Sequence, residues 1–448
     1  MTVDQMGRLS AGPSPRLQRF SWALFDWAQQ PYFTLAGAFL FKPYFSSDFV
    51  GDPIRGQALI GLAGGIGAAG VALVSPLVGA SLDGGARPKR WIMTTSVIFV
   101  LCCAGLWFAQ PGRLDLLPLI MAFLVIAAVS GEVLITANNA MLPHLTTPRA
   151  LGRLSGSAVA LGFLGGLTAL ILYMLAFNLP DRPLLGLDRA TFEPQRFVGP
   201  YVAIWYAVFI LPMLLWTPDR PTAPGKAKES LRSLLPLLRR RPAMTRFLIG
   251  RMLIGDGLSA ASVFAGILAA GLFDWETAEL ATFALLIMTL SGVGAWITGV
   301  ADDRFGPKTA VMVSVALLCV GVAGAGCVTA DRLFFVIPIT PPTVGDGFLA
   351  TTGERLFMGL GVLIGLSAGP LQASLRSWLA KLAPQDEIGR WFGLFAFSNK
   401  ATAFAAPLLI AGLTLIVKDQ RVTIPVVLVF LVAGLICLRK VPEGRVEP

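Results

Sequence analysis

Charged residues are scarce in this chain. Of its 448 residues only 14% are Asp, Glu, Lys or Arg, whereas 55% are hydrophobic and the mean hydropathy is +0.71. A soluble domain carries about 25% charged residues, so the composition excludes an ordinary water-soluble enzyme. It predicts one polytopic membrane protein in contact with lipid.

Histidine and cysteine are scarce as well. The one histidine is His144, and the five cysteines all fall inside apolar stretches with no metal-ligand spacing. We therefore expect no metal site, no disulfide framework and no cofactor. A Gly-x-x-x-x-Gly-Lys-Ser/Thr run is also missing, which argues against a nucleotide-driven pump. The sequence shows no His cluster and no nucleophile–base pair, which argues against a membrane enzyme.

What the chain does have is long apolar runs. A spanning helix needs about 20 mostly apolar residues, and the sequence holds twelve such segments. We predict them at 20–45, 56–81, 91–109, 115–142, 154–178, 199–217, 244–272, 280–301, 309–330, 356–382, 390–416 and 422–438. The predicted fold class is an all-α polytopic membrane protein with twelve transmembrane helices.

The longest polar interruption divides these segments into two sets of six. We predict an N-terminal tail (1–19), a six-helix bundle (20–217), a linker (218–243), a second six-helix bundle (244–438) and a C-terminal tail (439–448). The linker carries the largest basic cluster, which includes Lys226, Lys228 and Arg232. The positive-inside rule then places the linker and both termini in the cytoplasm, next to anionic lipid. The net charge of +10 is explained in this way, and we expect no nucleic-acid partner.

Each half repeats short motifs at the same ordinal position. They are Gly79-Ala-Ser-Leu-Asp83, with Arg87 after it, and Gly299-Val-Ala-Asp-Asp303-Arg304; and Gly152-Arg153 and Gly389-Arg390, before segments five and eleven. Parallel six-helix repeats and the acidic loop resemble the major facilitator superfamily and its signature loop. An acid there can cap a helix N-terminus or pair with Arg, so we expect the loops to hold the two bundles together. In the first copy Gly84 occupies the expected Arg position.

Several charges lie inside apolar segments, where each costs about 2.5–3.5 kcal/mol at the bilayer centre. They are Asp26, Glu132, Arg251, Asp256, Arg376 and Lys400. Such residues usually face the bundle interior or a water-filled path. Helical spacing puts Gln30 and Phe33 on the face of Asp26, Asn139 on the face of Glu132, and Gln372 one turn from Arg376.

A mixed set of acids and bases suits a zwitterion or an anion. Arg376 could hold a substrate carboxylate in a bidentate fork, and Lys400 could add a second positive charge. Asp26 or Glu132 could bind an amine or carry a coupling proton. The alternative is that these charges pair with one another as interhelical locks.

Further strings resemble one branch of the superfamily, the unknown major facilitator family, which includes the autophagy-related vacuolar amino-acid effluxers. They are Trp22-Ala-Leu-Phe-Asp26-Trp27-Ala, Asn139-Ala-Met-Leu-Pro143, Gln372-Ala-Ser-Leu-Arg376-Ser377 and Lys400-Ala-Thr-Ala403 with Pro407, where we expect a kink. The resemblance covers most of the chain and implies a transporter. For the fungal vacuolar members it implies export of neutral amino acids to the cytosol. The chain departs from the branch at Gln29-Gln30-Pro31 and at Asn399.

The sequence therefore predicts a secondary active transporter of a small polar or zwitterionic solute, with an amino acid as one candidate, driven by coupling to protons. Organic anions and peptides are alternative cargoes, and a membrane-embedded sensor or scaffold is the alternative function. We expect a monomer in a bacterial cell inner membrane.

Overall fold

A computed structural model describes residues 13–219, 234–329, 331–333, 336–341, 347–402, 409–410, 412–413, 416–417 and 423–444. Of the predictions above, the basic residues Lys226, Lys228 and Arg232 and the kink at Pro407 lie outside these residues. The N-terminal half contains α2 (Pro15–Pro31), α3 (Phe41–Tyr44), α4 (Pro53–Asp83), α5 (Pro88–Gly105), α6 (Leu117–Leu145), α7 (Leu151–Tyr173), α8 (Glu193–Arg196), α9 (Val198–Phe209) and α10 (Leu211–Trp216).

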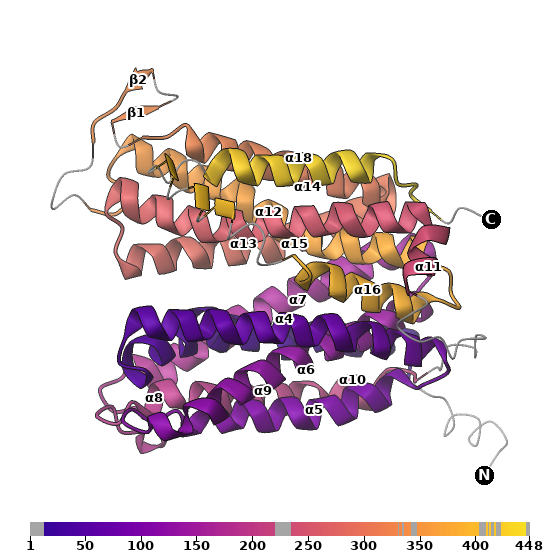
Figure 1. The fold of residues 1–448 in the computed structure, drawn as a ribbon, viewed down its shortest axis with the longest axis horizontal. Coiled ribbons are helices and arrows are strands. Elements are labelled where there is room, and N and C mark those ends of the chain that lie inside the picture. Colours follow the sequence, from indigo (N-terminus) through magenta and orange to yellow (C-terminus); the bar gives the residue numbers. More distant parts are fainter. Residues whose placement is uncertain are drawn as a thin grey trace, which may run out of the picture.

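The C-terminal half is also helical. It contains α11 (Leu234–Arg240), α12 (Pro242–Phe273), α13 (Thr277–Phe305), α14 (Pro307–Gly326), α15 (Thr352–Leu382), α16 (Ile388–Lys400) and α18 (Thr423–Arg439). One short antiparallel hairpin, β1 (Arg332–Leu333) with β2 (Ile337–Pro338), lies between α14 and α15. The expected fold class is confirmed, because the chain is built from apolar helices in two bundles (Figure 1).

Each predicted segment is mostly helical over its described residues, although α14 ends at Gly326, before the predicted end of its segment. Nine of the described helices are long and apolar enough to cross a membrane. A 31-residue helix such as α4 rises about 46 Å, more than the roughly 30 Å hydrocarbon core. The first segment is the most irregular of those described: after Pro31 it continues through two wide π-helical turns (Tyr32–Phe39 and Phe45–Phe49) and the short α3. The sixth is divided between α9 and α10 at Ile210.

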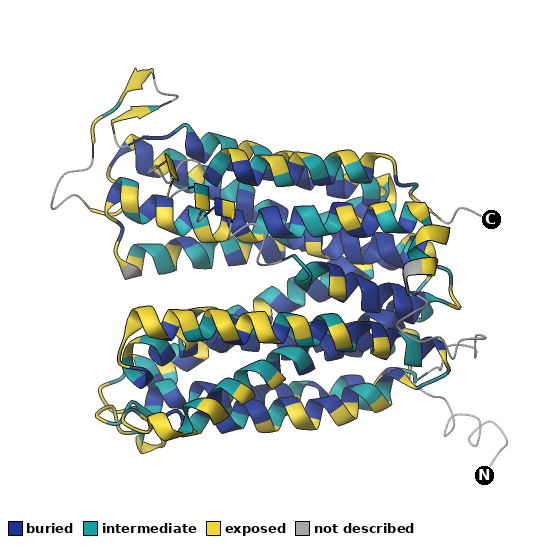
Figure 2. Ribbon diagram, in the orientation of Figure 1, coloured by how far each residue is buried: buried dark blue, intermediate teal, exposed yellow. Residues whose placement is uncertain are grey.

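Both described ends of the chain lie at the same end of the molecule, which we call the terminal end (Figure 1). There the two bundles come together, whereas toward the opposite end, the distal end, their ribbons diverge. The helices that meet at the terminal end are largely buried, and α4 presents exposed residues along its distal part (Figure 2). Large apolar side chains such as Leu73, Leu101 and Val429 are exposed on the outside, as expected of a surface that faces lipid rather than water.

Candidate functional site

Arg376 of α15 lies at the centre of a polar network that joins the two halves. One terminal nitrogen, Nη1, donates to Asp26 Oδ2 of α2 at 3.0 Å and to Asn139 Oδ1 of α6 at 3.3 Å. Its Nε donates to Ser155 Oγ of α7 at 2.8 Å, and Nη2 donates to the Ser155 carbonyl, also at 2.8 Å. The guanidinium carbon lies 5.2 Å from the centre of the Trp22 ring, a cation–π distance.

All three nitrogens of the Arg376 guanidinium are therefore engaged by the protein itself. The residue is buried, and removing one partner of a buried ion pair typically costs about 3–5 kcal/mol. In this arrangement Arg376 joins the two halves through an ion pair, as in the lock alternative considered above.

A second ion pair crosses between the halves. Lys400 Nζ of α16 lies 2.9 Å from Glu132 Oε1 of α6. The neighbouring Arg251 of α12 donates through Nη1 to the carbonyl of Phe395 at 2.7 Å and to Ser398 Oγ at 3.0 Å. Its guanidinium carbon lies 3.4 Å from the centre of the Phe395 ring. Asp256, also on α12, accepts from Thr402 Oγ1 at 2.6 Å.

The other predicted binding residues lie around these pairs. Gln30 is partly buried on α2, and a Cβ added at Gly166 of α7 would come within 2.9 Å of its Cγ. Phe33 is partly buried and packs edge-on against Tyr32, with ring centres 5.4 Å apart. Gln372 is exposed, one turn of α15 nearer the distal end than Arg376.

The repeated loops form two contacts at the terminal end, and we call the first the Asp83 latch. Asp83, the last residue of α4, accepts from the backbone N–H groups of Gly389 at 2.7 Å and Arg390 at 2.9 Å. These are first-turn amides of α16, which have no partner inside their own helix. The Arg390 side chain also approaches the carboxylate, with Nε 3.8 Å from Oδ2.

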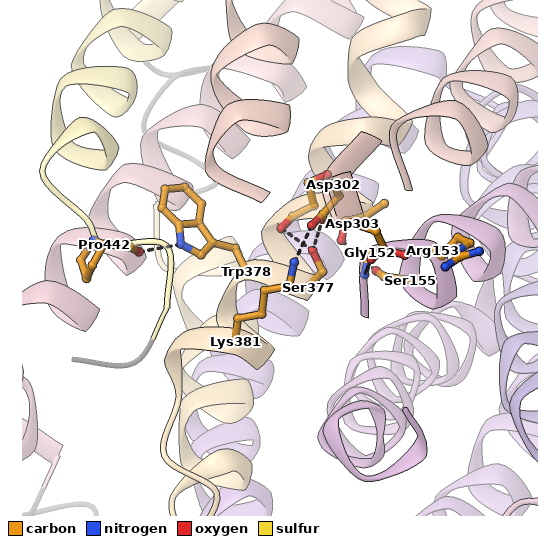
Figure 3. Close-up of polar contacts among 11 residues, drawn as sticks. Gly152, Arg153, Ser155, Asp302, Asp303, Ser377, Trp378, Lys381 and Pro442 are labelled. Carbon is orange, nitrogen blue, oxygen red and sulfur yellow. Dashed lines mark hydrogen bonds and ion pairs between the residues drawn. The ribbon is translucent and has the colours of Figure 1, made fainter. Parts of the chain in front are cut away.

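The Asp303 latch is its repeat partner. Asp303 Oδ1 accepts from the N–H of Gly152 in the first turn of α7 at 2.9 Å, and Oδ2 accepts from Arg153 Nε at 3.1 Å (Figure 3). Gly306, with φ +88°, ends α13 just after this acid. The loop residues Arg87 and Arg304 are exposed, and Arg304 lies over the Phe305 ring.

Glycines let the helices approach closely beside both latches. A Cβ at Gly79 would lie 2.3 Å from the carbonyl oxygen of Gly389, and one at Gly156 would lie 2.6 Å from the Cα of Gly299. Neither contact leaves room for a side chain. Small residues therefore set the spacing of α4 with α16 and of α7 with α13.

Sequence reasoning missed two residues of this region, Ser155 and Asp302. Ser155, one turn into α7, provides two of the acceptors of Arg376 and itself donates to the Ala373 carbonyl at 2.8 Å. Asp302 is buried and binds Lys381 at 2.8 Å and the Ser377 hydroxyl (Figure 3). The available signals were the adjacent acids 302–303 and the serine of the Gly152-Arg153-Leu-Ser motif.

Comparison with known proteins gives a consistent result. Residues 46–447 match the family described as "Vacuole effluxer Atg22 like". The chain is 21% identical over 435 residues to YxiO of Bacillus subtilis, an uncharacterized MFS-type transporter, covering 95% of both chains. It is 24% identical over 351 residues to autophagy-related protein 22 of Yarrowia lipolytica, covering 71% of this chain and 55% of that protein. The match thus spans about half the length of such fungal relatives.

Solved structures show the same fold. FucP, a major facilitator superfamily transporter in its outward conformation, superposes with a TM-score of 0.70 at 15% identity, covering 96% of this chain and 99% of that chain. The proton:xylose symporter XylE gives a TM-score of 0.68 at 13% identity, covering 96% of both chains. At these identities the likeness concerns the fold alone.

Proposed function

The chain belongs to the vacuole effluxer Atg22-like family of the major facilitator superfamily, and from that premise we propose a secondary active transporter for a small polar or zwitterionic solute. Amino acids are the first class to test. The protein is a multi-pass membrane transporter of the superfamily type and not an enzyme. The cargo, its coupling and its direction belong to the proposal.

The observation that carries the proposal is the Arg376 network. One side chain of the C-terminal half binds Asp26, Asn139 and Ser155 of the N-terminal half, at the place where the bundles come together. In alternating access one bundle rocks against the other around a central site. Opening the terminal end would require these bonds and both latches to break, so the network acts as the gate of a transport cycle.

We further propose that protons couple to this gate through Asp26 or Glu132. Each acid pairs with a cation of the opposite half, Arg376 or Lys400. Adding a proton to either carboxylate removes the charge that holds its pair together, and the freed cation can then bind substrate. We propose that the terminal end and both termini face the cytoplasm of a bacterial cell, because exposed basic residues of the described loops, such as Arg87 and Arg304, lie there.

Flux measurements in proteoliposomes test this function. We expect uptake of a labelled solute to accelerate when an inward proton gradient is imposed, and Asp26→Asn and Glu132→Gln to abolish that acceleration. Arg113→Gln, an exposed loop change, is the control and should transport normally. Transport that ignores the gradient, with full activity in both acid variants, would refute proton coupling; no flux of any tested solute would refute transport.

An organic anion is the second candidate cargo. It is favoured by one observation, the excess of cations around Glu132.

A further inference from the structure

Around Glu132 the positive charges outnumber the negative ones. Lys400 pairs with Glu132 at 2.9 Å, and Arg251 binds Phe395 and Ser398 of α16, the helix that ends at Lys400. Among the described residues, Arg251 binds the Phe395 carbonyl, the Ser398 hydroxyl and the Phe395 ring. Among the described residues no carboxylate lies within ion-pair distance of it. These three side chains, from α6, α16 and α12, thus carry one uncompensated positive charge.

A third cation extends this cluster toward the distal end. Lys42 lies within electrostatic range of Lys400 and lines a cavity of 380 Å³ together with Ser46, Ser47 and Gln57. No carboxylate is among the described residues that line the cavity. The nearby acids are used locally, since Asp48 accepts from Ser47 Oγ at 2.6 Å and Asp52 caps the start of α4. Lys42 is thus the one cation among the described residues that line this open cavity.

The Arg376 network shows what a balanced site looks like in the same molecule. There Asp26 offsets Arg376, and all guanidinium nitrogens are hydrogen-bonded. Uncompensated charge inside the membrane is costly, and an unpaired charge away from water is far costlier than a paired one. A site kept with excess positive charge is consequently one that a negative ligand completes.

We propose that Lys400 and Arg251 form an anion subsite, with Lys42 at its entrance, that binds a carboxylate of a net-negative organic acid. Glu132 competes with that carboxylate for Lys400. A proton added to a Glu132 carboxylate oxygen ends the competition, so the proton and the anion bind together. The inference rests on the proposed transport function and names its substrate class.

The decisive experiment measures ligand-induced thermal stabilisation of the purified full chain. The probes are four solutes that differ in charge: succinate, lactate, alanine and putrescine. We expect succinate or lactate to stabilise the protein, with no response to putrescine and a weaker one to alanine. Stabilisation by alanine or putrescine alone, or by none of the four, overturns the anion subsite.

Paired variants then separate binding from folding. Lys400→Met should weaken anion binding about 10- to 100-fold, the value of a hydrogen bond to a charged group, and Lys400→Arg should restore most of it. Glu132→Gln should strengthen anion binding at neutral pH, because Lys400 loses its competitor. Equal weakening by Lys400→Met and Glu132→Gln would mean that the pair is merely structural and would overturn the inference.

Two controls keep the outcomes distinct. Arg113→Gln removes one cation outside the cluster and should leave anion binding unchanged. Labelled succinate flux in proteoliposomes separates the two proposals: flux of zwitterions but not anions overturns the subsite and leaves transport standing. Anion binding without flux of any solute overturns the transport function instead.

Discussion

The Asp83 latch and the Asp303 latch occupy equivalent places in the two halves, yet the membrane protein surrounds them differently. In the Asp83 latch the acid is 1% exposed and Arg390 is 7% exposed. In the Asp303 latch the acid is 10% exposed and Arg153 is 65% exposed. Both acids accept backbone N–H groups at a helix start, so the two latches share the same type of contact. They differ in how much free energy each contributes to the closed terminal end.

The difference follows from what each acid binds. Asp83 holds two backbone amides and lies beside a buried arginine, whereas Asp303 holds one amide and a largely solvated arginine. Exposed ion pairs contribute about 0–1 kcal/mol, and breaking a buried one costs about 3–5 kcal/mol. We infer that the Asp83 latch carries most of the energy that keeps the terminal end closed.

The largest expected effect is that of Asp83→Ala. It leaves two amides of α16 without their acceptor and removes the carboxylate beside Arg390, so the closed terminal end should lose about 3–5 kcal/mol. The distance between spin labels at the exposed positions 87 and 386 should become longer in a larger fraction of the variant molecules than in the wild type. The matched Asp303→Ala, with labels at 149 and 304, should open the end less. Equal opening by the two variants would contradict the comparison.

Arg376→Lys tests the Arg376 network, which joins the two halves in addition to the two latches. Lysine keeps the charge but cannot reach Asp26, Asn139 and Ser155 at once, because it lacks the planar fork. Substrate affinity should fall about 10- to 100-fold, the value of a hydrogen bond to a charged group, while the folded protein is retained. A titration that follows thermal stabilisation by the best ligand measures this, and wild-type affinity in a well-folded variant would refute the role.

Gly79→Ala and Gly156→Ala break the close helix contacts beside each latch. The added Cβ would lie 2.3 Å from the Gly389 carbonyl oxygen in the first case and 2.5 Å from the Ala295 carbonyl oxygen in the second. Overpacking of this kind costs about 1–3 kcal/mol, and both variants should favour the open terminal end. Gly64→Ala is the control, because nothing lies within 4 Å of its added Cβ. Distances between the same spin-label pairs that match the wild type in both variants would show that these contacts do not set the closure.

Arg153→Ala should have the smallest effect. Its side chain is mostly in solvent, so its loss should cost no more than about 1 kcal/mol. Raising the salt concentration should weaken the Asp303 latch in the wild type and leave the buried Asp83 latch unchanged. Label distances at low and high salt test both statements. A salt response confined to positions 87 and 386 would reverse the assignment of the stronger latch.

Hydropathy predicted the helices because lipid offers the backbone no hydrogen-bond partners. Every spanning segment must satisfy its amides internally and present apolar side chains, which leaves a plain signal in runs such as α4 and α6. The first segment departed from an unbroken helix at Pro31, where the chain continues in wide turns. Proline explains why the regular ladder ends there, but the sequence contains no signal for the width of the turns that follow.

The candidate site was predicted in its members and less well in its pairings. Asn139 and Arg376 were both named as candidates from the faces they occupy, and the structure adds that the two side chains lie 3.3 Å apart. The sequence left two alternatives for Arg376: bidentate binding of a substrate carboxylate, or an interhelical ion pair. In this structure Arg376 forms an ion pair with Asp26. Gln372 was predicted as a site residue because it lies one helical turn from Arg376. In the structure it is exposed and has no polar partner among the described contacts. The substrate and proton roles of these residues remain predictions.

By itself the sequence determined that the chain is a bundle of membrane helices with a few acids and bases kept inside, because charge is too costly in lipid to persist without a purpose. Only the tertiary structure decided which charges meet: Asp26 with Arg376, 350 positions apart, and Glu132 with Lys400. Periodicity along a helix fixes which face a side chain takes. Partners on other helices depend on how the two bundles pack, and no local pattern records that.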